Sequence, residues 1–178
     1  MTRLITAISL WMCIHSLLAQ PTIQDCLGAI PVCQSTYTED RSPSGQGNIR
    51  NEIPPGVTCI YGDNNSIWYI FNASEDGQLG FIITPNDLND DYDWALFNLT
   101  GRSCNQLNRS NLESCNAAGG PGCHGQTGCS ARGTGNYTEG GCNNTGPIND
   151  LVPMQAGETF VLVVSNWTGS TNGYTIDF

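Results

Sequence analysis

The chain has 178 residues, contains no lysine and carries a formal net charge of −10, with 16 acidic residues against 6 arginines. Such an acidic surface repels nucleic-acid phosphates and suits cations, so binding to DNA or RNA is excluded. Without lysine, a lysine-based catalytic mechanism is excluded as well.

Residues 1–19 have the pattern of a secretory signal. Arg3 is followed by a short apolar stretch, and the small Ala19 stands at a suitable cleavage point. The stretch is shorter than the about 20 apolar residues that a membrane span requires. We therefore expect a secreted or cell-surface chain in which residues 20–178 form a single domain, with no membrane insertion after cleavage.

Short β-branched and aromatic runs separated by Gly, Asn, Asp and Pro predict strands rather than helices. The run at 67–71 is apolar on both faces, which is typical of a central strand of a sandwich. The turn at 75–77 predicts a hairpin between it and a second strand at 79–84. The run at 93–99 predicts a third strand.

An acidic loop precedes the third strand and offers oxygen ligands at closely spaced positions: Asp87, Asn89, Asp90, Asp91 and Asp93. Calcium takes about six to eight such oxygens, so the loop predicts a structural Ca²⁺ site and no organic cofactor. It is not an EF-hand, because Tyr92 replaces the required glycine and Asn98 the bidentate glutamate. The alternative interpretation is a solvated acidic turn.

The segment 101–153 is dense in Gly, Asn and Cys and cannot fold by hydrophobic packing alone. We interpret it as a disulfide-rich insertion, and its alternative is an inert spacer. Eight cysteines remain after signal cleavage, an even number that indicates a disulfide framework rather than a zinc site: Cys26, Cys33, Cys59, Cys104, Cys115, Cys123, Cys129 and Cys142. Cys104 with Cys115 is the favoured first pairing, because both lie in one loop.

Two further strands are expected at 159–166 and 174–178. Together the runs predict an all-β chain, a two-sheet jelly-roll-like β-sandwich with a long disulfide-rich loop. Because the last strand reaches the end of the chain, we expect this sequence to be the N-terminal part of a longer protein.

Aromatic residues near the ends of strands suggest sugar stacking, with Trp167 and Tyr92 as candidates, whereas tryptophan within a strand is more often core. The acids cluster in one turn and do not face each other across a cleft as the catalytic pair of a glycosidase does. No catalytic residue is therefore expected.

Five segments carry a resemblance to a known module, in the same order along the chain: 25–34, 65–71, 91–100, 156–164 and 173–178. The chain resembles the N-terminal β-sandwich module of gliding-motility-associated and adhesin-like proteins that Bacteroidota-type bacteria export through type IX secretion. It is also similar to pre-peptidase C-terminal and CUB-like sandwiches, in which an Asp before a central strand often helps to bind calcium. The stretch 123–142 departs from this pattern, and the usual C-terminal sorting domain is missing.

The resemblance implies an extracellular, non-catalytic module for binding, adhesion or display, calcium-stabilised and directed at a polysaccharide or another cell-surface ligand. The alternative is an accessory, carbohydrate- or substrate-binding domain of a secreted hydrolase whose catalytic domain is absent from this sequence.

Overall fold

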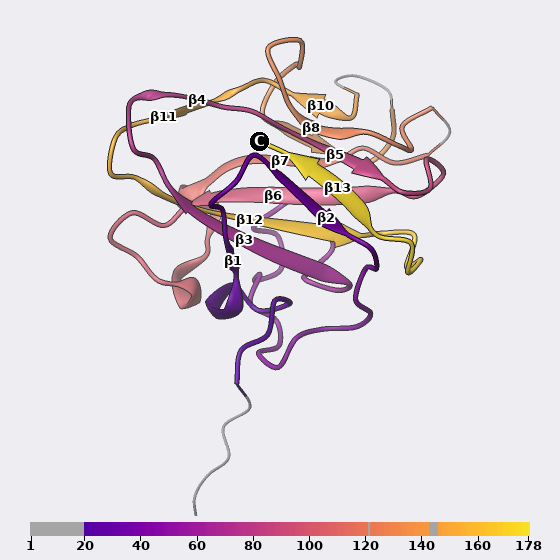
Figure 1. The fold of residues 1–178 in the computed structure, drawn as a ribbon, viewed down its shortest axis with the longest axis horizontal. Coiled ribbons are helices and arrows are strands. Elements are labelled where there is room, and N and C mark those ends of the chain that lie inside the picture. The colour runs from indigo at the N-terminus through magenta and orange to yellow at the C-terminus, as the bar shows by residue number, and fades with distance from the viewer. Residues whose placement is uncertain (1–19, 121, 143–145) are drawn as a thin grey trace, which may run out of the picture.

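The computed structural model describes residues 20–120, 122–142 and 146–178, so the expected signal at 1–19 lies outside the described residues. Two large β-sheets are stacked on each other (Figure 1), which confirms the predicted all-β sandwich. Helical structure in the described ranges is limited to three single 3₁₀ turns: Cys26–Gly28, Cys104–Gln106 and Arg109–Asn111. None of the helices described here is long and apolar enough to cross a membrane.

The first sheet has six strands. In spatial order they are β1 (Ile30–Pro31), β3 (Ser66–Asn72), β12 (Thr159–Asn166), β6 (Tyr92–Asn98), β7 (Leu112–Ala117) and β9 (Tyr137–Glu139). The strands β3, β12, β6 and β7 are antiparallel neighbours, whereas β1 and β9 add parallel edges. The longest strand, β12, has the bounds that its apolar run predicts.

The second sheet has five strands, and a short ribbon lies beside it. In spatial order the five are β10 (Ile148–Asn149), β8 (Thr127–Cys129), β5 (Phe81–Pro85), β13 (Tyr174–Asp177) and β2 (Thr36–Glu39). The ribbon pairs β11 (Val152–Met154) with β4 (Gly77–Leu79).

The predicted hairpin between 67–71 and 79–84 is wrong. The strand β3 pairs with β1 and β12 in the first sheet, whereas β5 pairs with β13 and β8 in the second. Residues 73–80 therefore cross between the sheets, and β4 pairs with the distant β11 on the way. A turn-like sequence alone does not determine whether the next strand stays in the same sheet.

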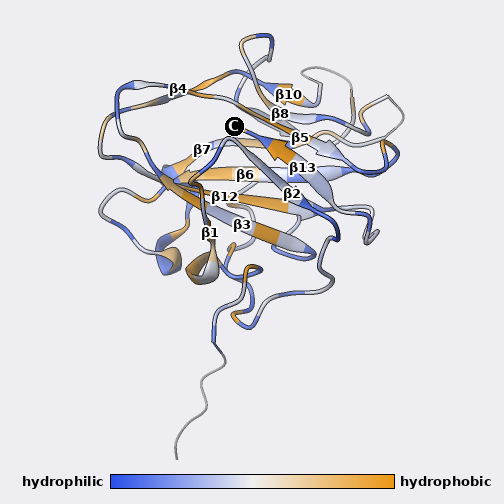
Figure 2. Cartoon of the chain, viewed as in Figure 1, coloured by the Kyte–Doolittle hydropathy of each residue, from blue (hydrophilic) through white to orange (hydrophobic). Residues whose placement is uncertain are grey.

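The first sheet is buried on both faces, which explains its nearly continuous apolar runs (Figure 2). On the inner face Trp94 and Leu96 of β6 pack against residues of the second sheet such as Ile176. On the outer face Ala95 and Phe97 belong to a second cluster, which residues of the segments 26–29 and 53–60 cover. Alternate residues of one strand thus serve two cores.

Two disulfides fix the N-terminal segment on this outer face. They join Cys26 to Cys104 and Cys59 to Cys115, and a third joins Cys123 to Cys142. The favoured Cys104–Cys115 pairing is wrong, because each of these cysteines instead reaches back across the sheet to a distant segment.

Cys33 and Cys129 are free thiols in the structure, so their assignment to the disulfide framework is also wrong. Cys33 is exposed and Cys129 is buried in the core of the sandwich. Burial raises the pKa of the Cys129 thiol to about 12, so that it behaves as an inert apolar side chain.

The segment 101–153 forms strands of both sheets of the sandwich. It contributes β7 and β9 to the first sheet, β8 and β10 to the second, and β11 to the ribbon. A polar network also holds it: Asn149 is fully buried, and its side-chain amide donates to the Ser114 hydroxyl and the Cys115 carbonyl, each at 3.0 Å. Backbone pairing and buried amides therefore order a segment that has little apolar surface.

Candidate functional site

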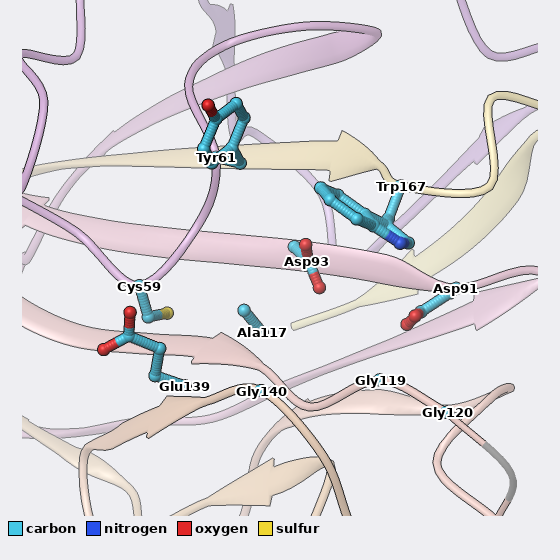
Figure 3. A pocket seen from close by; sticks show the side chains of 10 residues that line it. All are labelled: Cys59, Tyr61, Asp91, Asp93, Ala117, Gly119, Gly120, Glu139, Gly140 and Trp167. Carbon is cyan, nitrogen blue, oxygen red and sulfur yellow. The ribbon is translucent and has the colours of Figure 1, made fainter.

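A pocket of about 300 Å³ opens on the outer face of the first sheet, beside the N-terminal segment that contains Cys59 and Tyr61 (Figure 3). Its lining comes from β6, β7, β9, the N-terminal segment and the loop after β12: Cys59, Tyr61, Asp91, Asp93, Ala117, Gly119, Gly120, Glu139, Gly140 and Trp167. This volume lies at the small end of the range for ligand pockets and far exceeds the about 30 Å³ of one water molecule. It suits a ligand the size of a single sugar ring.

The floor of the pocket follows from strand register. Trp94 of β6 pairs with Asn116 of β7, so Asp93 lies next to Ala117 in the following row. Ala117 in turn pairs with Glu139 of β9. Because neighbouring strands lie about 4.8 Å apart, the two carboxyl-bearing residues stand roughly 10 Å apart across the sheet, with only a methyl group between them. The small Ala117 thus creates the hollow.

Asp91 and Asp93 form the acidic part of this floor. They are 4% and 6% exposed, and neither carboxylate accepts a hydrogen bond from the residues that the structure describes. Burial, followed by repulsion from Asp91, raises the pKa of Asp93 to about 7. Burial also raises the pKa of Asp91, and the nearby His124 opposes that shift. Among the described residues the one buried side-chain polar atom without a partner is Trp68 Nε1, so the oxygens of Asp91 and Asp93 reach the solvent of the pocket and can accept hydrogen bonds there.

Trp167 lies at the rim of the pocket, and hydrogen bonds to the backbone of Asp91 hold it there. Its backbone N–H donates to the Asp91 carbonyl at 2.9 Å, and the Asp91 N–H donates to the Thr168 hydroxyl at 2.8 Å. Trp167 is nevertheless 62% exposed. Its ring lies beside the pocket (Figure 3). A large aromatic side chain on a fixed backbone, open to solvent beside a pocket, is a typical anchor for a ligand.

Tyr61 contributes a second aromatic ring to the rim. It is 82% exposed and lies two residues after Cys59, whose disulfide to Cys115 ties this part of the N-terminal segment to β7. The disulfide therefore determines where the phenol ring lies relative to the floor.

Gly119 permits a close approach of backbone to the acidic pair. A Cβ atom at this position would lie 2.7 Å from Oδ2 of Asp91, closer than van der Waals contact allows. An alanine at this position would therefore push the Asp91 carboxylate aside.

The structure divides the five residues of the predicted calcium loop. Asp87 and Asn89 are exposed, and the Asp87 carboxylate accepts hydrogen bonds from the backbone and side-chain N–H groups of Asn89. Asp90 is buried and accepts from Ser170 at 2.6 Å and Asn172 at 3.1 Å.

Of the predicted set, only Asp91 and Asp93 therefore line the pocket together. Within the described ranges, no group of three or more His, Cys, Asp or Glu side chains is arranged to hold a metal ion. The role of Asp90 is instead to anchor the loop that follows β12.

Of the two predicted stacking residues, the structure brings only Trp167 to the pocket. Tyr92 is 3% exposed, so its assignment as a stacking residue is wrong. Its side chain points to the inner face, where its hydroxyl donates to the Gly173 carbonyl at 3.1 Å and hydrogen-bonds Ser42 at 2.6 Å. Alternation along β6 explains the difference, because Asp91 and Asp93 face outward and Tyr92 faces the core.

Glu139 and Tyr61 were not predicted from the sequence. Glu139 lies in a short strand that periodicity does not reveal. For Tyr61 the sequence offers one indication: the residue lies between Cys59 and Gly62, and glycine is typical of turns at the surface. Comparisons of the chain with protein-family models, with curated proteins and with solved structures found no match, so the site must be interpreted from its own geometry.

Proposed function

We propose that this chain is an extracellular, non-catalytic module that binds a carbohydrate in the pocket between Trp167 and the Asp91–Asp93 pair. One observation carries the proposal: a fixed, exposed indole stands beside two buried carboxylates that lack donors. Above a pH of about 7, where Asp93 is ionised, the carboxylates only accept hydrogen bonds, so the ligand must bring donors. A sugar supplies hydroxyl donors on its edge and an apolar C–H face for the aromatic ring.

The disulfides support an oxidising, extracellular location for this function. Sugar binding of this kind would serve a surface or adhesion module of the type that the sequence resembles. It would equally serve an accessory domain that holds a hydrolase on its substrate.

Glycosidases place two carboxyl groups on opposite sides of the scissile bond. Asp91, directly before β6, and Asp93, within it, instead lie two positions apart in extended chain and face the same side. This arrangement favours binding over hydrolysis. Release of new reducing ends from a bound oligosaccharide would contradict the non-catalytic part of the proposal.

Affinity electrophoresis in gels that contain soluble polysaccharides tests the binding. The wild-type protein is expected to be retarded by at least one polysaccharide, and Trp167→Ala is expected to migrate as in a gel without it. Leu88→Ala is the matched control, because Leu88 is 63% exposed and does not line the pocket. Equal retardation of wild type and Trp167→Ala would place the binding elsewhere.

A further inference from the structure

Acidic side chains line the pocket, and among the described residues no basic side chain lines it with them. Three of its lining residues are carboxylates. His124 opposes the raised pKa of Asp91, whereas the pKa of Asp93 is raised by burial and by Asp91. Two like charges at a buried site repel each other once both groups are ionised, and a bound cation relieves that repulsion.

The spacing of the pair suits an ammonium group. Residues two apart on a strand are separated by about 7 Å, and side chains on the same face can converge from there. Two charge-assisted N–H···O bonds of about 2.8 Å each span roughly 5.5 Å. A single protonated amine can therefore donate to Asp91 and Asp93 at once.

The remainder of the lining argues for a cation that carries a ring. Calcium requires about six to eight oxygen ligands and gains nothing from an indole or a phenol ring. The pocket of about 300 Å³ is also much larger than one ion requires. Trp167 and Tyr61, in contrast, offer apolar faces to a ring and electron-rich faces to a positive charge.

We propose that the pocket selects an amino sugar with a free, protonated amine, which lies between Asp91 and Asp93 while the sugar ring packs against Trp167. This inference rests on the proposed carbohydrate binding and specifies its ligand class. Neutral sugars fit the same space but leave the charge of the pair uncompensated. Acidic sugars are repelled by the floor and by the net charge of −10 of the whole chain.

Titration calorimetry of the oxidised protein with three matched trimers tests this selectivity: a glucosamine trimer, its N-acetylated form and a glucose trimer. The glucosamine trimer is expected to bind at least about tenfold more tightly than either uncharged trimer, the equivalent of about 1.4 kcal/mol. Added salt should reduce that preference, because it screens the charge.

Each of the variants Asp91→Asn and Asp93→Asn is expected to remove the preference, so that the glucosamine trimer binds about as tightly as the uncharged trimers. The reason is that the amine loses one of its two carboxylate partners. Asp87→Asn is the matched control, because it removes the same charge from an exposed position of the same loop that does not line the pocket. The control should keep the full preference. Thermal unfolding of each variant verifies that it is folded.

Three results would overturn the inference. If all three trimers bind equally and Trp167→Ala loses all of them, carbohydrate binding stands and the amine selectivity is wrong. If no trimer or polysaccharide binds, the proposed function fails and the inference fails with it. If Ca²⁺ raises the unfolding temperature through Asp91 and Asp93 and abolishes amine binding, the pair belongs to a metal ion.

Discussion

At the scale of single residues, the buried acids at the start of β6 differ in their surroundings. Asp90 is satisfied by Ser170 and Asn172 and holds a loop in place. Asp91 and Asp93 have no donors among the described residues and open onto the pocket. Neighbours in one acidic run therefore differ in function because alternate positions on a strand face different surroundings.

The raised pKa of Asp93 predicts a pH-dependent cost to folding. Below the ordinary value of 3.8 the carboxyl is protonated in both the folded and the unfolded chain, and there is no cost. As the pH rises to about 7, the unfolded chain ionises first and stability falls, by roughly 4 kcal/mol once both states are ionised. Without ligand, Asp93→Asn should therefore unfold at a higher temperature than wild type at pH 8.

Thermal unfolding of both proteins across this pH range measures the effect. The advantage of Asp93→Asn should shrink steadily between pH 7 and pH 4 and vanish below that. An advantage of constant size across the range would show that it does not arise from ionisation of Asp93.

At the scale of elements, the pocket is assembled by segments that lie far apart in the chain. The Cys59–Cys115 disulfide ties Tyr61 to the sheet, and backbone hydrogen bonds to Asp91 hold Trp167 on the opposite side. The position of Tyr61 thus depends on a disulfide, and the position of Trp167 depends on backbone hydrogen bonds.

Removal of the Cys59–Cys115 bridge in a double alanine variant should lower the free energy of unfolding and also weaken binding. The bridge spans 56 positions, which corresponds to roughly 4 kcal/mol of lost chain entropy in the unfolded state. The Cys123–Cys142 bridge spans 19 positions and corresponds to roughly 3 kcal/mol. Neither Cys123 nor Cys142 lines the pocket, so their removal is the control for binding.

Denaturant unfolding and titration with the preferred trimer separate the two effects. The expected result is a loss of stability in both double variants and weaker binding only where Tyr61 is released. Weaker binding of the same size in both would mean that stability, and not the position of Tyr61, governs the affinity.

At the scale of the whole molecule, the sequence contained the fold class but not its connections. The apolar runs at 67–71, 93–99 and 159–166 correspond closely to β3, β6 and β12, because buried strands require them. The partner of each strand depends on contacts between segments distant in sequence, so the hairpin to β5 and the Cys104–Cys115 pairing were predicted wrongly. Local patterns do not encode such long-range choices.

The candidate site was predictable to a similar extent. Asp91, Asp93 and Trp167 stand out in the sequence by charge and position, and the structure places all three at one pocket. Tyr61 and Glu139 reach it only through the disulfide and the register of β7 with β9. The sequence therefore singled out three of the lining residues, two as calcium ligands and one as a stacking residue, whereas the fold was needed to place the others beside them.

Protection of Trp167 from collisional quenching tests the central claim most directly. Of the tryptophans in residues 20–178, Trp68 and Trp94 are fully buried, so acrylamide quenching of a protein that comprises these residues reports on Trp167. A saturating oligosaccharide ligand is predicted to reduce that quenching markedly, with no such change in Trp167→Phe. Unchanged quenching of Trp167 while calorimetry shows full binding would contradict the account.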